Sequence, residues 1–126
     1  MKKALIVEDH PDILEILIQV LESLGFTVVS ANTGMEGVEK AITEKPHLIL
    51  MDIMMPQMNG QEATRLIRSN TETKNVPILA ITALSRESEQ KECIKAGCND
   101  YILKPFTSKD LREKIQTILD PPRGTQ

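Results

Sequence analysis

The chain has 126 residues, of which 40% are hydrophobic and 26% charged, with a formal net charge of −3. This size and composition are typical of one globular domain with an apolar core. The negative charge and the low aromatic content (2%) argue against direct binding of nucleic acid or of an anionic membrane. No apolar run approaches the ~20 residues of a membrane span, and two cysteines make no disulfide framework. We therefore expect a cytoplasmic protein.

Short apolar segments alternate along the chain with longer segments whose apolar residues recur at helical spacing. The expected strands are 4–7, 26–31, 48–51, 76–81 and 100–103. The first expected helix has helically spaced apolar residues over 13–24, with Pro11 suited to its first turn and Asp9 or His10 at its cap. The other expected helices are 35–44, from just after residue 60 to 69, 86–96 and 108–119. We expect residues 1–120 to form the domain and residues 121–126 (PPRGTQ) to be a flexible tail or the start of a linker.

This alternation predicts an α/β fold, with a parallel sheet, right-handed crossovers and helices on both faces. All strands of a parallel sheet end at the same edge, where open α/β sheets bind their ligands. That edge would collect the polar residues that end or follow the first, third, fourth and fifth strands, namely Glu8, Asp9, Asp52, Thr82 and Lys104.

Three carboxylates at one edge would repel one another strongly without a counter-ion. A hard divalent cation such as Mg²⁺ suits oxygen ligands of this kind. Lys104 supplies a charge that can pair with an anion or with Asp52, and Thr82 supplies a hydroxyl. Because an aspartate can act as the nucleophile in phosphoryl transfer, this set of groups is suited to forming an aspartyl phosphate.

Five stretches add a more specific pattern: 5–9 (LIVED), 52–60 (DIMMPQMNG), 81–83 (ITA), 96–101 (AGCNDY) and 104–106 (KPF). In order and spacing they resemble the receiver domain of bacterial two-component response regulators, which includes the single-domain chemotaxis regulators. The resemblance covers about residues 2–120. It implies a flavodoxin-like, doubly wound fold with a five-stranded parallel sheet of order 2-1-3-4-5.

The resemblance also implies roles for the acidic residues. Asp52 would be phosphorylated by a histidine kinase or a histidine phosphotransfer protein. Mg²⁺ (or Mn²⁺) would be held by Asp9 directly, by Glu8 mainly through water, by Asp52 and by the backbone carbonyl of Met54. Such a receiver domain is no enzyme in the usual sense, because it catalyses only its own phosphorylation and dephosphorylation.

The remaining site residues would bind the phosphoryl group and pass the signal on. Thr82, with Ala83 beside it, resembles the switch hydroxyl, and Lys104 the lysine that contacts the phosphoryl oxygens. Tyr101 occupies the aromatic position that moves from exposed to buried, and the Lys104–Pro105 bond would be cis. The face formed by the fourth helix, fifth strand and fifth helix would then change shape. It would control an unknown partner or output domain, or form a dimer.

Apolar side chains stand two residues after Asp52 and two after Thr82, at Met54 and Leu84. In the family these positions tune how fast water removes the phosphoryl group. Since apolar side chains exclude water, we expect a long-lived phosphorylated state.

Three other functions compete with this interpretation. A phosphatase of the haloacid dehalogenase type would carry Asp-x-Asp after its first strand and a cap domain, for which we expect no room in 126 residues. A flavodoxin would need a phosphate-binding loop after the first strand, where Glu8 and Asp9 would repel phosphate. A receiver-like module that is never phosphorylated is disfavoured, because every reactive position is filled.

Overall fold

The structure, a computed structural model, describes residues 2–55, 57–83 and 86–120. Five parallel strands form one sheet in the order β2-β1-β3-β4-β5, which confirms the predicted fold and strand order. The strands are β1 (Lys3–Val7), β2 (Thr27–Ala31), β3 (Leu48–Asp52), β4 (Ile78–Thr82) and β5 (Asp100–Leu103). The helices are α1 (Pro11–Ser23), α2 (Gly34–Glu44), α3 (Gly60–Ser69), α4 (Glu87–Ala96) and α5 (Ser108–Leu119).

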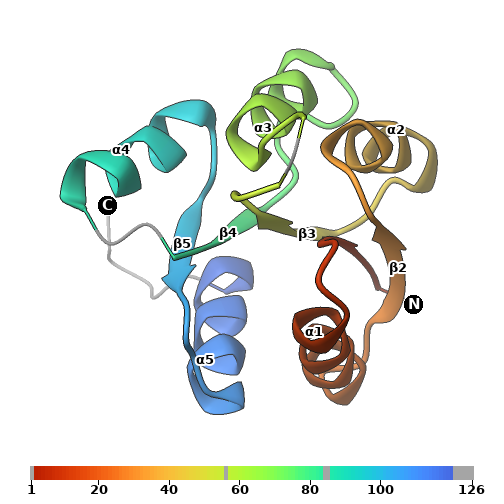
Figure 1. Cartoon of the computed structure of the whole chain (residues 1–126). Helices are drawn as coiled ribbons and strands as arrows, with labels where there is room; N and C mark the ends of the chain where they lie inside the picture. The colour runs from red at the N-terminus through yellow and green to blue at the C-terminus, as the bar shows by residue number, and fades with distance from the viewer. Residues whose placement is uncertain (1, 56, 84–85, 121–126) are drawn as a thin grey trace.

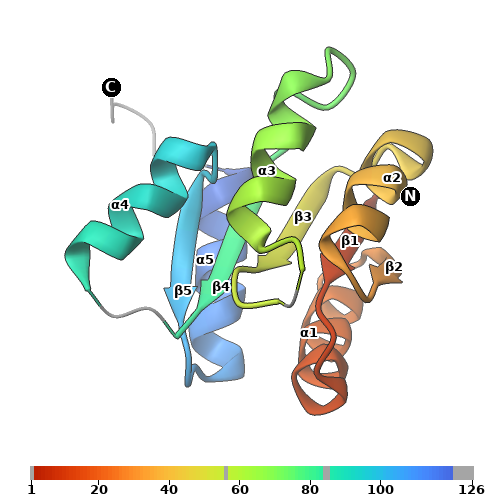
Figure 2. The same cartoon turned by 45° about the horizontal axis from the view of Figure 1, so that its top comes forward.

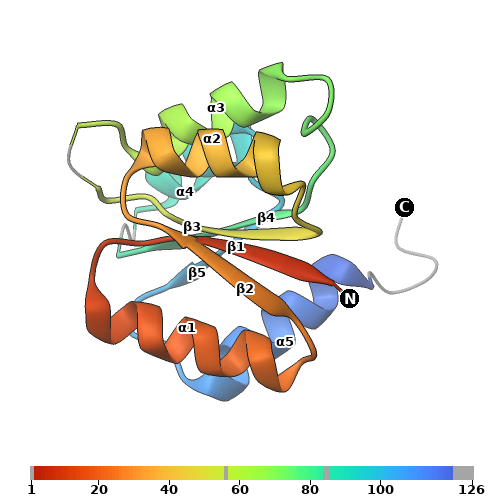
Figure 3. The ribbon, with the colours of Figure 1, turned by 90° about the vertical axis from the view of Figure 1, so that its right-hand side faces the viewer.

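The molecule has three layers, with α1 and α5 on one face of the sheet and α2, α3 and α4 on the other (Figures 1 and 3). Each face carries its own apolar core. On the α1/α5 side, Leu17 and Leu111 pack with strand residues such as Leu50; on the other side, Val38 and Ile67 do so. The predicted tail, residues 121–126, lies outside the described residues.

Strand β3 shows why the short apolar segments become strands. All five of its residues are buried, and successive side chains of a strand point to opposite faces. Ile49 and Met51 therefore join one core, whereas Leu48 and Leu50 join the other. A strand that is apolar on both faces is stable only when helices cover both faces. Asp52 is the first polar residue of β3, and it stands at the carboxyl end of the strand, at the edge of the sheet.

Local chemistry sets where the elements begin and end. Helix α1 begins at Pro11 with His10 at the N-cap, as predicted, since proline is favoured in the first turn. Strand β4 begins at Ile78 rather than at residue 76, because Pro77 has no N–H to donate to a neighbouring strand. Side chains of Thr33, Asn59 and Thr107 cap the starts of α2, α3 and α5.

The two cysteines are buried free thiols on the α3/α4 side of the sheet. Burial raises the pKa of the Cys98 thiol to about 11, which keeps it protonated and unreactive at neutral pH. The prediction that both act as small apolar core residues agrees with this burial. In the described parts of the chain, no helix has the length and apolarity needed to cross a membrane.

We predict that Gly60→Ala destabilises the fold. A Cβ at this position would meet the backbone oxygen of Asp52 and would lie 2.9 Å from the Cα of Ile53. Backbone atoms cannot move aside like a side chain, so we expect a loss of about 1–3 kcal/mol in the free energy of unfolding, measured with urea. Arg65→Ala, at an exposed position of the same helix, is the control; an equal, small effect of both would contradict the prediction.

Candidate functional site

The parallel register brings the ends of four strands to one edge of the sheet (Figure 2). Val7 is level with Met51, Asp52 with Ile81, and Thr82 with Leu103. The polar residues predicted to share this edge are therefore in place. Glu8 directly follows β1, Asp52 ends β3, Thr82 ends β4 and Lys104 directly follows β5.

Three carboxylates converge at this edge. Glu8, Asp9 and Asp52 each offer one oxygen atom, and these three atoms lie within 4.8 Å of one another. Glu8 is only 1% exposed and Asp52 only 2%, whereas Asp9 is exposed. The cluster thus has two buried acids and one that is open to solvent.

A single ammonium group faces the buried acids. Lys104 Nζ lies 3.4 Å from Asp52 Oδ1 and donates a hydrogen bond to it. The same Nζ lies 3.8 Å from Glu8 Oε1, too far for a hydrogen bond. Glu8 Oε2 accepts a hydrogen bond from the backbone N–H of His10 at 3.1 Å, but Oε1 is buried and has no hydrogen-bond partner among the described residues.

Burial raises the pKa of Glu8 from its ordinary value of 4.5 to about 7. The neighbouring Asp52 carboxylate raises this pKa further, whereas the His10 N–H and Lys104 oppose the shift. The raised pKa of Glu8 and the lack of a partner for its Oε1 have the same cause, which is an excess of buried negative charge over the charge of Lys104. A further cation would balance it, and the all-oxygen donor set fits a hard divalent ion such as Mg²⁺.

The loop after β3 folds back over the acid at its end. The backbone N–H of Met54 donates to Asp52 Oδ1 at 3.2 Å, which orients the carboxylate. The Met54 side chain is 60% exposed. Gly60 closes this loop, since its N–H donates to the backbone oxygen of Ile53 at 3.1 Å.

The other predicted site residues lie on β4, on β5 and beside them. Thr82 is fully buried at the end of β4, and Ala83 after it is exposed. Tyr101 is half-buried on β5, outside the acidic cluster. The Lys104–Pro105 peptide bond is cis. Leu84, one of the two predicted lifetime positions, lies outside the described residues.

Sequence reasoning missed two residues that contact Tyr101. Its hydroxyl donates to Gln90 Oε1 on α4 at 3.0 Å, and Lys114 Nζ on α5 lies 5.7 Å from the centre of its ring. Neither residue stands in a motif. The only signal available in the sequence was their place on the two helices expected to flank the fifth strand.

Comparison with known proteins gives one consistent family. The family described as "Response regulator receiver domain" matches residues 4–116. The chain is 36% identical to Protein PilH of Pseudomonas aeruginosa over 119 residues, covering 94% of this chain and 98% of that protein. It is 46% identical over 116 residues to hybrid signal transduction histidine kinase G of Dictyostelium discoideum, covering 90% of this chain. The matched region is only 3% of the length of hybrid kinase G, and a similar match covers 8% of the length of hybrid signal transduction histidine kinase D of the same organism.

Solved structures agree in fold. The receiver domain of sensor histidine kinase PA1611 from Pseudomonas aeruginosa, solved with a magnesium ion coordinated in its active site cleft, has a TM-score of 0.85 and 35% identity. The match covers 94% of this chain and 97% of that one. CheY from Borrelia burgdorferi, in a complex with CheX, BeF₃ and Mg²⁺, has a TM-score of 0.86 and 28% identity over 93% of this chain and 88% of that one.

We predict that, in the presence of a chelator, Glu8 makes the protein less stable as the pH rises from about 4.5 to about 7. In this window the folded protein keeps a proton on Glu8 that the unfolded chain has already released, so a rise in pH favours unfolding. The measurement is the free energy of unfolding against pH, compared with Glu8→Gln, whose side chain does not titrate. The difference between the two curves should change through this window, and a constant difference would contradict the raised pKa.

Proposed function

This chain belongs to the family of response regulator receiver domains, the receiving modules of two-component phosphorelays, and from that premise we propose that Asp52 is its phosphoacceptor. An oxygen of the Asp52 carboxylate attacks phosphorus, and the bond from phosphorus to a histidine nitrogen of the donor breaks. That nitrogen keeps the electron pair. The donor is a histidine kinase or a histidine phosphotransfer protein.

One observation carries this proposal above all. Asp52 is a buried carboxylate with an ammonium group at 3.4 Å and two further acids around it. The Met54 N–H and Lys104 both point to Oδ1, which holds the carboxylate in one orientation. Lys104 is then placed to bind an oxygen of the incoming phosphoryl group and to offset its charge.

We propose that the acidic cluster holds Mg²⁺ or Mn²⁺. Asp9, Asp52 and the backbone carbonyl of Met54 would bind the ion directly, and Glu8 mainly through water. The ion would neutralise charge on the transferring group. Without it, Glu8 and Asp52 share one lysine, and an added phosphoryl group would meet their combined negative charge.

The signal then leaves the site through the residues beside it. Thr82 and Ala83 would move toward the phosphoryl group on Asp52, Tyr101 would become more buried, and the face formed by α4, β5 and α5 would change. That face would bind a partner, an output domain or a second copy of the chain. The partner's identity stays open.

The same proposal covers the chain's wider role. It would act as a phosphoacceptor that catalyses only its own phosphorylation and dephosphorylation, within a domain of residues 1–120 that leads into a tail or linker. A location in the cytoplasm stays a prediction from the sequence.

Asp52→Asn should abolish phosphorylation. An amide is a poor nucleophile at this position, so treatment with acetyl phosphate and Mg²⁺ should give an acid-labile phosphoryl group on the wild type and none on the variant. Intact-mass spectrometry measures the phosphorylated fraction. Asp120→Asn, at an exposed position on the end of α5, should be phosphorylated like the wild type. Equal labelling of Asp52→Asn and wild type would refute the assignment.

The phosphorylated state should be long-lived, because the Met54 side chain is apolar and stands two residues after the acceptor. We expect Met54→Asn to hydrolyse at least about tenfold faster, a change of ~1.4 kcal/mol in the barrier, since a polar side chain can hold the attacking water. The half-life after removal of acetyl phosphate is the measurement. Met35→Asn replaces another exposed methionine, 49% exposed on α2, and should leave the half-life unchanged. A wild-type half-life of seconds would contradict the prediction.

A further inference from the structure

Tyr101 is held by contacts from two helices at once. From α4, Gln90 Oε1 accepts a hydrogen bond from the tyrosine hydroxyl at 3.0 Å. From α5, Lys114 Nζ lies 5.7 Å from the ring centre, which is within the range of a cation–π contact. A change in the position of the ring would therefore break these contacts or require Gln90 and Lys114 to move with it.

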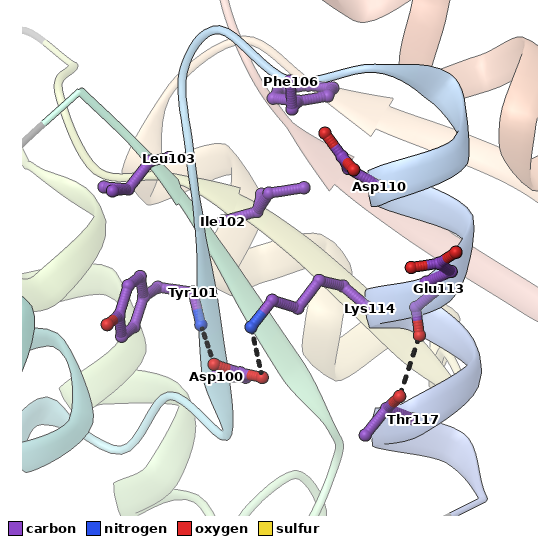
Figure 4. A pocket seen from close by; sticks show the side chains of 9 residues that line it. All are labelled: Asp100, Tyr101, Ile102, Leu103, Phe106, Asp110, Glu113, Lys114 and Thr117. Atoms are coloured by element: carbon purple, nitrogen blue, oxygen red, sulfur yellow. Dashed lines mark hydrogen bonds and ion pairs between the residues drawn. The ribbon is translucent and has the colours of Figure 1, made fainter.

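The α5 contact is itself fixed by the neighbour of Tyr101. Lys114 Nζ donates to Asp100 Oδ2 at 3.1 Å, and Asp100 Oδ1 accepts the backbone N–H of Tyr101 at 2.7 Å. Figure 4 shows the lysine reaching from α5 to Asp100, close to the start of the tyrosine side chain. The Asp100 carboxylate thus links the cation to the strand that carries Tyr101.

The strand register connects this arrangement to the phosphorylation edge. Tyr101 is level with Ala80 of β4, and Leu103 is level with Thr82. Because side chains alternate along a strand, Ala80 and Thr82 lie on the same face of the sheet as Tyr101. On β4 the residue level with Tyr101 is Ala80, whose side chain is small. A movement of Thr82, two residues further along β4, could therefore change the space available to the tyrosine ring.

Tyr101 also shapes the surface on both sides of β5. It lines a hollow between β5 and α5, with Phe106 and Lys114 among the other residues (Figure 4). It equally lines a hollow on α4 formed with Gln90 and Ile94. A change in the position of this one ring would alter both hollows together.

We infer that Gln90 and Lys114 are positioning residues, which hold Tyr101 in the position described here and so set how readily the switch responds. This inference rests on the proposed function of Asp52 and Tyr101. In this arrangement Lys104 contacts the Asp52 carboxylate directly, and we take the Tyr101 position that accompanies this contact as that of the unphosphorylated chain. Loss of either contact would favour the phosphorylated arrangement.

The chain offers a direct probe, because Tyr101 is its only tyrosine and it has no tryptophan. Tyrosine fluorescence, or the single set of ring signals in NMR after tyrosine labelling, therefore reports on Tyr101 alone. Beryllofluoride with Mg²⁺ serves as the phosphoryl mimic. In Gln90→Leu, the signal without the mimic should move toward that of the wild type with the mimic. The beryllofluoride concentration for half-maximal change should fall about two- to tenfold, the worth of one hydrogen bond.

Matched variants separate positioning from general damage. Gln90→Glu keeps an acceptor oxygen for the tyrosine hydroxyl and should titrate like the wild type. Lys114→Met should shift the titration in the same direction as Gln90→Leu, and Lys114→Arg should restore it. Gln116→Leu makes the same chemical change at an exposed position of α5 and should have no effect. Urea unfolding shows that each variant is folded.

The outcomes distinguish this inference from the function on which it rests. If Asp52 is phosphorylated but Gln90→Leu has the wild-type tyrosine signal and titration, the inference is overturned and the proposed function stands. The inference is also overturned if phosphorylation leaves the Tyr101 signal of the wild type unchanged. If Asp52 takes up no phosphoryl group, the proposed function itself fails; the tyrosine signal of Gln90→Leu without the mimic still decides whether Gln90 positions the ring.

Discussion

The negative charge gathered at one edge of the sheet is the constraint on which the rest of the site depends. A parallel sheet with apolar strands brings the strand ends together, and here they bring two buried carboxylates and a third at the surface within reach of one lysine. Folding makes this concentration of charge, and only protonation or a cation can relieve it. The raised pKa of Glu8 and its partnerless oxygen are two signs of that one imbalance.

The packing of the sheet keeps this excess of negative charge in place. The apolar cores on the two faces of the sheet hold the strand ends rigidly, so the acids cannot move apart to lower their repulsion. A carboxylate kept in one orientation, beside acids that could hold a divalent cation, is suited to the phosphoacceptor role that we propose for Asp52.

The alternation of strands and helices was predictable because a strand that is buried on both faces needs an almost continuous run of apolar residues. In a parallel sheet the carboxyl ends of all strands lie at one edge. The sequence alone therefore placed five residues together at that edge: Glu8, Asp9, Asp52, Thr82 and Lys104. The start of α1 at Pro11 was predictable from the proline itself, whereas β4 begins two residues later than predicted because of Pro77.

Other features of the site could not be predicted. Glu8 is buried and its neighbour Asp9 exposed, a difference that depends on how the chain turns after β1. The contacts of Tyr101 with Gln90 and Lys114 depend on side-chain conformations on two helices far apart in sequence. The cis bond at Lys104–Pro105 was expected only from family resemblance. None of these features leaves a periodic pattern in the sequence.

The most direct test of the charge imbalance is the anomalous scattering of Mn²⁺ in crystals of the protein, which locates the ion without assumption. We expect an anomalous peak between Asp9, Asp52 and the backbone carbonyl of Met54, with Glu8 linked to the ion mainly through water. A crystal in which Mn²⁺ binds at other carboxylates and leaves this cluster without a peak would contradict it.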